Sequence, residues 1–225
     1  MQYILSVSGG LDSAVLCAVL IAEHGAASVL PVFFRYGSKH NPREERSAHA
    51  VAAHYGVALT TVDLSPVFAH LDSALLAHDT RAVPQAPYDS ETMRLTVVPG
   101  RNLIFASVLA AFAENLGGGV IALATHAGDH ALYPDCRPSF NASLERTVSE
   151  SSGGAVRLTT PFSAMDKIAI VARGMVLRVP FHLTRSCYES DAASCGRCGT
   201  CMERLSAFAS NNIVDPIEYF HCSVK

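Results

Sequence analysis

The stretch Tyr3-Ile4-Leu5-Ser6-Val7-Ser8-Gly9-Gly10-Leu11-Asp12-Ser13 decides the fold of this chain. Its first part is mostly apolar and predicts a strand, while residues 14–22 behind it have a helical pattern. A tight turn of small residues joins the two. Glycines let the backbone approach an anion closely, and the unpaired N–H groups of the first helical turn then point at it. The stretch therefore predicts a phosphate-binding loop and a nucleotide ligand.

This loop differs from the common P-loop, which needs a lysine after its last glycine. The pattern Ser8-Gly-Gly-x-Asp-Ser13 instead resembles the signature of the N-type ATP pyrophosphatases. The resemblance implies that ATP is split between its α- and β-phosphates, so that an oxygen is adenylated and pyrophosphate leaves. The alternative is a glycine turn that only joins a strand to a helix. Such a turn would need neither Asp12 nor both serines.

Composition limits the class of protein. With 225 residues, 49% of them hydrophobic, the chain can bury the core of one large domain. Its net charge of −3 disfavours a strong grip on long nucleic acid. The start of the chain lacks a secretory pattern, and no apolar run reaches the roughly 20 residues of a membrane span without a polar break. We therefore expect a cytoplasmic protein that binds neither nucleic acid nor a membrane.

Predicted strands and helices alternate along the chain. The expected strands are 3–7, 28–34, 57–64, 120–125, 157–160 and 181–184, and the expected helices are 13–24, 44–55, 67–77, 101–116, 139–149, 163–174 and 202–210. This alternation predicts an α/β fold with a doubly wound, mainly parallel, Rossmann-like sheet. We expect an ATP pyrophosphatase domain over residues 1–184 and a cysteine-bearing, helical segment over residues 185–225.

Ligands of such sheets bind outside the carboxyl ends of the strands. The loops expected there carry three cationic or basic candidates for phosphate and pyrophosphate chemistry, namely Lys39, His40 and Arg101. A fourth candidate, Lys167, lies early in a predicted helix. A further loop carries two carboxylates, a phenol and a guanidinium, namely Asp129, Asp135, Tyr133 and Arg137. Its carboxylates suit the N–H edge of a guanine-like base or Mg²⁺, and its arginine suits a carboxylate or phosphate. The alternatives are solvated surface charges and a polar surface turn.

Four of the seven cysteines, Cys187, Cys195, Cys198 and Cys201, lie within fifteen residues. Four sulfurs at about 2.3 Å from one ion make a closed tetrahedral zinc site. Because a closed site has no position for substrate, we expect its role to be structural. An iron–sulfur cluster and redox-active thiols are the alternatives.

Together these motifs resemble the 7-cyano-7-deazaguanine synthase family over nearly the whole chain. The shared motifs are Ser8-Gly-Gly-x-Asp-Ser13, Tyr36-Gly-x-Lys-His40, Val98-Pro-Gly-Arg-Asn102, Tyr133-Pro-Asp-Cys-Arg137, Thr160-Pro-Phe162, Asp166-Lys167 and the four cysteines. The resemblance implies that 7-carboxy-7-deazaguanine, ammonia and ATP give the nitrile through an adenylated acid, an amide and an adenylated amide. It also implies ATP, Mg²⁺ and Zn²⁺ as cofactors, and a homodimer.

Functional residues are assigned on these motifs. We assign ATP binding to Val7, Ser8, Gly9, Gly10, Leu11, Asp12, Ser13, Phe34 and Arg101, catalysis to Asp12, Lys39, His40, Arg101 and Lys167, substrate binding to Asp129, Tyr133, Asp135 and Arg137, and metal binding to the four cysteines.

The chain departs from the family pattern at a few positions. Leu11 and Ser38 stand where the family usually has glutamine, and residues 127–132 lack a glutamate, a serine and a glycine that the family has. These departures leave open a paralogue that adenylates the same acid but transfers it to another amine or to a protein, as in deazaguanine-based DNA modification or anti-phage defence. A base-thiolating pyrophosphatase and a non-enzymatic, nucleotide-binding scaffold are further alternatives.

Overall fold

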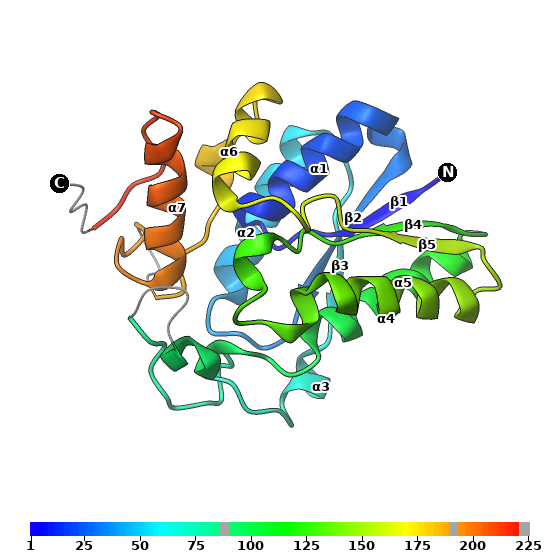
Figure 1. The fold of residues 1–225 in the computed structure, drawn as a ribbon, viewed down its shortest axis with the longest axis horizontal. Helices are drawn as coiled ribbons and strands as arrows, with labels where there is room; N and C mark the ends of the chain where they lie inside the picture. The colour runs from blue at the N-terminus through cyan, green and yellow to red at the C-terminus, as the bar shows by residue number, and fades with distance from the viewer. Residues whose placement is uncertain (86–90, 190–192, 221–225) are drawn as a thin grey trace.

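Five short parallel strands form the sheet at the centre of the molecule (Figure 1). The computed structural model describes residues 1–85, 91–189 and 193–220. The strands are β1 (Tyr3–Ser6), β2 (Val29–Arg35), β3 (Thr60–Asp63), β4 (Gly119–Ala122) and β5 (Val156–Thr159), in the order β3-β2-β1-β4-β5. Every neighbouring pair is parallel. The predicted doubly wound α/β fold is confirmed.

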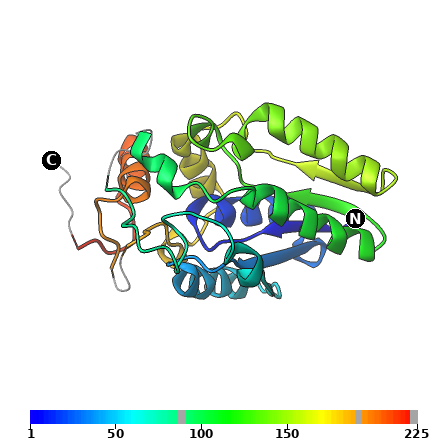
Figure 2. The same cartoon turned by 90° about the horizontal axis from the view of Figure 1, so that it is seen from below.

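Helices cover both faces of this sheet. They are α1 (Leu11–His24), α2 (Asn41–His54), α3 (Ser65–Phe68), α4 (Arg101–Asn115), α5 (Pro138–Ser151), α6 (Lys167–Val176) and α7 (Gly199–Ser210). Residues of α1, α2, α6 and α7 share one buried cluster, and residues of α3, α4 and α5 share another. In Figure 2, α7 lies at the end of the molecule toward which the strands run.

The central strands β1, β2 and β4 are nearly continuous apolar runs because both of their faces are buried. Ile4 packs into the cluster under α4 and α5, while its neighbour Leu5 packs into the cluster under α1 and α6. Val32 and Phe33 divide between the two clusters in the same way. Successive side chains of a strand point to opposite faces, so a strand covered on both sides needs apolar residues at consecutive positions.

One predicted strand is wrong. Residues 181–184 form a short 3-10 turn, Phe181–Leu183, outside the sheet. Phe181 packs against α6 so closely that a Cβ on Gly174 would lie 2.4 Å from its ring. Its carbonyl oxygen accepts hydrogen bonds from Thr184 and Arg204 instead of from a neighbouring strand. The segment is apolar because it is packed in the core, and not because it pairs in a sheet.

Two predicted helices differ most from the observed ones. The helix expected over 67–77 is limited to α3, and turns follow it. The helix expected over 163–174 begins at Lys167, because Asp166 caps it by accepting a hydrogen bond from the Ala169 N–H at 2.8 Å. The predicted domain boundary at residue 184 stays a prediction, and residues 190–192 and 221–225 of the second segment lie outside the described residues.

One stretch, Met93–Asn115, has the length and the mean hydropathy of 1.6 expected of a membrane-spanning helix. Most of it is α4, and α4 packs on β1 and β4 through Phe105, Ala106 and Leu109. A core helix of a soluble protein passes the same test of length and composition. The position of α4 against the sheet accounts for those of its apolar side chains that are buried, while Leu103 is exposed.

The phosphate-binding loop crosses α2 at Gly9. This residue has a φ of +75°, and a Cβ there would lie 2.4 Å from the Glu44 carbonyl oxygen and 2.6 Å from the Ala48 nitrogen. Both atoms belong to backbone that cannot move without breaking the helix. Only glycine therefore fits at this crossing.

We expect Gly9→Ala to lower the free energy of unfolding by about 3 kcal/mol or more, since it combines left-handed backbone strain with backbone overlap. Gly56→Ala is the matched control, because Gly56 has a φ of +66° and nothing within 4 Å of its ideal Cβ. That control should cost about 1 kcal/mol. Denaturant unfolding of the two variants measures the difference, and equal losses would contradict the close contact.

Candidate active site

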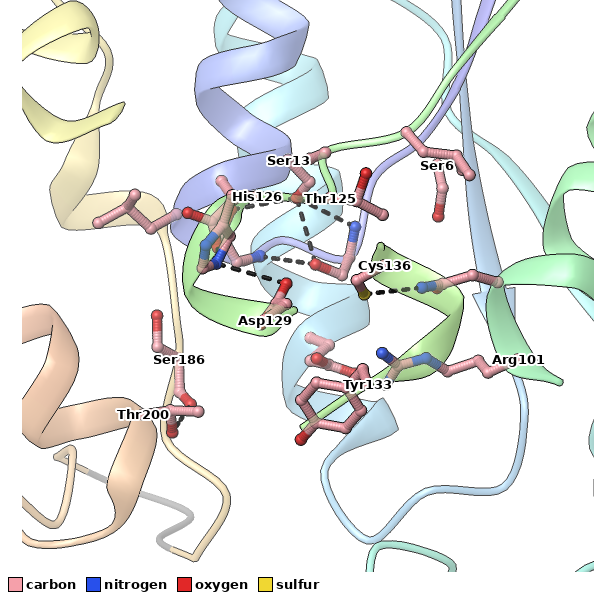
Figure 3. Close-up of a pocket in the computed structure, with 18 of the residues that line it drawn as sticks. Ser6, Ser13, Arg101, Thr125, His126, Asp129, Tyr133, Cys136, Ser186 and Thr200 are labelled. Atoms are coloured by element: carbon pink, nitrogen blue, oxygen red, sulfur yellow. Dashed lines mark hydrogen bonds and ion pairs between the residues drawn. The ribbon is translucent and has the colours of Figure 1, made fainter. Parts of the chain in front are cut away.

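A pocket of about 210 Å³ opens at the carboxyl ends of the strands (Figure 3). It brings together the Ser8–Ser13 loop, the end of β2, the start of α4 and the loop that follows β4. Residues just before α7 and in its first turn close another side of the pocket. Figure 3 shows Ser186 and Thr200 there, across from Arg101 and Tyr133. The predicted position of the site at this edge of the sheet matches the pocket.

Serine hydroxyls hold the phosphate-binding loop in shape. The Ser13 hydroxyl accepts a hydrogen bond from the Ser8 N–H at 3.2 Å and donates one to the Gly10 carbonyl oxygen at 3.1 Å. The Ser8 hydroxyl accepts a hydrogen bond from the Gly10 N–H at 3.2 Å. Gly10 is the N-cap of α1, so the free N–H groups of the first turn face the pocket. The loop has the donors and the helix dipole that bind an anionic phosphate.

Asp12 and Lys167 form an ion pair beside this loop, with Nζ 2.6 Å from Oδ2. Glu203 of α7 approaches the same ammonium at 3.3 Å. Burial raises the pKa of Asp12, but the charges of Lys167 and His126 outweigh it and hold that pKa below its usual value. Burial lowers the pKa of Lys167, and the Asp12 and Glu203 charges more than reverse this. Lys167 is therefore a permanent cation at the phosphate end of the pocket.

His126 links this ion pair to the loop after β4. Its Nδ1 accepts a hydrogen bond from the Gly128 N–H at 3.1 Å, so a neutral ring carries its proton on Nε2. Nε2 lies 3.4 Å from Asp129 Oδ2 and 3.9 Å from Asp12 Oδ2. Sequence reasoning missed His126, although its place directly after the strand expected over 120–125, in a loop already singled out, could have pointed to it.

Carboxylates near the phosphate loop fit Mg²⁺ by their chemistry. Asp12 Oδ1 is buried and has no partner within the described ranges. Asp129 also lines the pocket. Carboxylate oxygens together with the phosphate oxygens of a nucleotide are the usual ligands of this ion.

The other half of the pocket holds a buried polar cluster around Arg101. The His40 Nε2 atom lies 3.3 Å from the Tyr36 hydroxyl and 3.6 Å from Glu44 Oε2. Burial lowers the pKa of His40 to about 3, and the Arg101 and Arg43 charges act in the same direction. Burial likewise raises the pKa of Glu44 to about 7, against the charge of Arg101. His40 is therefore a neutral imidazole.

Several predicted residues lie away from the pocket. Lys39 Nζ donates hydrogen bonds to the carbonyl oxygens of Ala74 and Arg81 at 2.8 and 2.6 Å. Asp135 accepts one from the Asn102 N–H at 3.1 Å, at the start of α4. Arg137 is exposed, and its Nε donates to the His130 carbonyl oxygen. The predicted residues that line the pocket are Ser8, Gly10, Leu11, Asp12, Ser13, Phe34, His40, Arg101, Asp129, Tyr133 and Lys167, while Val7 and Gly9 are not among the lining residues.

Sequence reasoning also missed lining residues other than His126. Polar and charged examples are Glu44, Arg185, Ser186, Tyr188, Thr200, Glu203 and Arg204. Those of α7 could have been found from the helical spacing that follows Cys198. Arg204 is fully buried and binds both Asp215 oxygens, at 2.7 and 2.9 Å. It thereby ties the segment after α7 to the pocket wall.

The four cysteines converge as the sequence predicts. Their Sγ atoms all lie within 4.8 Å of one another, and all four residues are buried. The N–H groups of Cys195 and Cys198 donate to sulfur at 3.3 Å, which suits thiolate ligands. Cys198 is also the N-cap of α7, so an ion held here fixes the start of that helix. The donor set fits one tetrahedrally bound metal ion.

We expect Cys198→Ser to lose the bound metal and to lower the melting temperature, because a structural four-cysteine site contributes on the order of 10 kcal/mol. Cys136→Ser is the control, since this buried thiol lies outside the cluster. Elemental analysis gives the metal content and its identity, and calorimetry gives the melting temperature. Full metal content in Cys198→Ser would contradict the assignment.

Comparison with known proteins identifies relatives over almost the whole chain. A sequence model described as queuosine biosynthesis protein QueC matches residues 2–212. The 7-cyano-7-deazaguanine synthase of Ruegeria pomeroyi is 38% identical over 221 residues, which cover 97% of this chain and 94% of the relative. The synthases of Marinobacter nauticus and Rhizobium leguminosarum are 37% and 39% identical and cover 94% and 97% of this chain, and 94% and 92% of the relatives.

Solved structures with the same fold are more distant in sequence. The NMN synthetase from Francisella tularensis has a TM-score of 0.50 at 14% identity and covers 95% of this chain and 78% of its own. The U34-tRNA thiolase NcsA from Methanococcus maripaludis has a TM-score of 0.53 at 13% identity, and the match covers 93% of this chain and 66% of the thiolase chain. Such likeness concerns the fold alone, whereas the sequence match extends from β1 to the end of α7. The chain belongs to the family of the queuosine biosynthesis protein QueC.

Proposed function

We propose that this chain is an ATP-dependent ligase that converts 7-carboxy-7-deazaguanine and ammonia into 7-cyano-7-deazaguanine, with release of AMP and pyrophosphate. The observation that carries the proposal is the pocket built around the Ser8–Ser13 loop and the Asp12–Lys167 pair. It occurs in a chain that matches synthases of this name over 94% or more of its length. The family match over residues 2–212 includes every element that lines the pocket.

ATP enters with its phosphates at the Ser8–Ser13 loop. The free N–H groups of the first turn of α1 donate to phosphate oxygens. Lys167 supplies the positive charge that the leaving pyrophosphate needs, because its own pKa is raised. Phe34 and Arg101 border the pocket at the ends of β2 and the start of α4. Mg²⁺, held by Asp12 and Asp129, would neutralise phosphate charge.

The reaction uses ATP for two successive activations. In the first, a carboxylate oxygen of the substrate attacks the α-phosphorus and the bond to pyrophosphate breaks. Ammonia then attacks the acyl carbon, the bond to AMP breaks, and an amide forms. In the second, the amide oxygen attacks the α-phosphorus of another ATP and the bond to pyrophosphate breaks. The C–O bond to AMP then breaks, and loss of both nitrogen-bound protons gives the nitrile. The protein contributes mainly by positioning the reactants and by stabilising the charge that moves to phosphate.

The four cysteines hold Zn²⁺ in this proposal and take no part in the reaction, since all four positions on the ion are filled by sulfur. The relatives are named for the synthase, and none favours the paralogue that transfers the acid to another amine. A homodimer and a cytoplasmic location stay predictions.

The product assay tests the function directly. Purified protein, 7-carboxy-7-deazaguanine, ammonium and MgATP should give the nitrile as the main product, with AMP and pyrophosphate, by mass spectrometry and phosphate analysis. An assay that stops at the amide would support the paralogue instead. Absence of pyrophosphate release would overturn the enzymatic proposal.

We expect Lys167→Met to reduce kcat by about 100-fold or more, since it removes the cation beside the departing pyrophosphate. Arg173→Met is the matched control, because Arg173 lies on the same helix and pairs with Glu23 on the surface. Unfolding measured alongside separates this effect from a loss of fold, as the change also leaves Asp12 and Glu203 without their shared counter-charge. A kcat for Lys167→Met close to that of Arg173→Met would contradict the role of this lysine.

A further inference from the structure

Glu44 borders the same pocket as the phosphate-binding loop. It lies in the first turn of α2, and its own carbonyl oxygen is the atom closest to the ideal Cβ of Gly9. Its side chain is 17% exposed and lines the pocket together with Tyr36, His40 and Arg101. A ligand in this half of the pocket therefore lies beside the loop that binds ATP.

The carboxylate of Glu44 is poorly satisfied by the protein. Its polar contacts within the described residues are the Asn41 amide at 3.5 Å and the His40 Nε2 atom at 3.6 Å. Both distances are at or beyond the limit of a hydrogen bond. His40 is uncharged, because burial lowers its pKa to about 3. A half-buried carboxylate with such weak partners is stabilised by any ligand that donates N–H groups to it.

The other carboxylates are already engaged. Asp12 and Glu203 share the ammonium of Lys167, and Asp129 faces the His126 ring at 3.4 Å. Asp135, which the sequence favoured for a guanine-like edge, accepts the N–H of Asn102 outside the pocket. Glu44 is thus the lining carboxylate that the described residues leave without a cationic partner within 4 Å.

The walls around Glu44 suit a flat heterocycle. Phe34 and Phe105 stack with ring centroids 4.2 Å apart, and Tyr36 meets Phe105 edge to face. Tyr188 packs against the same cluster of side chains, with its ring centroid 5.0 Å from that of His40. These rings line the pocket with Glu44. Aromatic walls with one buried acceptor pair are typical of sites for a nucleobase-like ring.

We propose that Glu44 is a specificity-determining residue that accepts hydrogen bonds from the ring N–H and the 2-amino group of the deazaguanine base. These two donors lie side by side on one edge of the ring, as the two oxygens do on a carboxylate. The inference rests on the proposed function, since it takes the substrate from it. The edge of the base opposite its carboxyl group is then held by α2, the helix that Gly9 contacts.

Binding of two ligands to three proteins tests this assignment. The ligands are 7-carboxy-7-deazaguanine and its analogue without the 2-amino group. The proteins are the wild type, Glu44→Gln and the control Glu45→Gln, whose carboxylate pairs with Arg35 outside the pocket. We expect the wild type and the control to bind the 2-amino ligand at least about tenfold more tightly by calorimetry. Glu44→Gln, which keeps the size of the side chain but has one acceptor, should bind the two ligands about equally.

Several results would overturn the assignment. A wild type without preference for the 2-amino ligand, or a Glu44→Gln variant that keeps the preference, would exclude Glu44 as the residue that reads this edge. A Glu44→Gln variant with unchanged affinities but slower turnover would assign Glu44 to the chemical step instead. If the wild type makes the nitrile in any of these cases, the proposed function stands without the inference. A wild type that binds neither ligand and gives no product would contradict both the proposed function and the inference.

Discussion

The contact between Gly9 and α2 is the constraint on which the rest of the pocket depends. At this point the backbone of the phosphate loop touches the backbone of a neighbouring helix, with no room for a single carbon atom between them. The contact places the loop and the first turn of α2 side by side, although they are separated by the whole of α1 and β2. The phosphate end of the pocket and the cluster around Arg101 therefore form one continuous surface. A reaction between two bound ligands needs such a surface, because the ligands must be held next to each other.

The charged groups of the pocket fall into the same two regions, the phosphate end and the cluster around Arg101. Next to the phosphate loop, carboxylates outnumber cations, and each is tied to Lys167 or His126. Around Arg101 the groups are mostly buried and several have pKa values far from their usual ranges, because burial dominates. The first half is suited to a highly charged ligand that brings its own counter-ions, and the second to a flat ligand with few charges.

Much of this arrangement could be predicted from the sequence, because it follows from local patterns. The phosphate loop, the alternation of strands and helices and the four cysteines each lie within a short stretch. The predictions that failed concern residues whose positions are set by contacts with distant parts of the chain. Lys39 is drawn away by carbonyl groups 35 and 42 residues later in the chain. Glu44, His126 and Glu203 come from three separate elements and carry no motif. The apolar pattern of 181–184 is equally compatible with a strand and with a packed turn, and only the neighbouring α6 decides between them.

Arg204 ties the segment that follows α7 to the interior of the protein. Its guanidinium is buried under α7 and its counter-charge, Asp215, lies after the helix has ended, with the Tyr219 hydroxyl bound to the same carboxylate at 2.6 Å. A protein shortened to residue 212, where the match to the family ends, would keep every described helix and still leave a buried cation without its carboxylate. Removing one partner of such a pair costs about 3–5 kcal/mol. We therefore expect the shortest stable form of this protein to include Asp215, which lies beyond the last described helix.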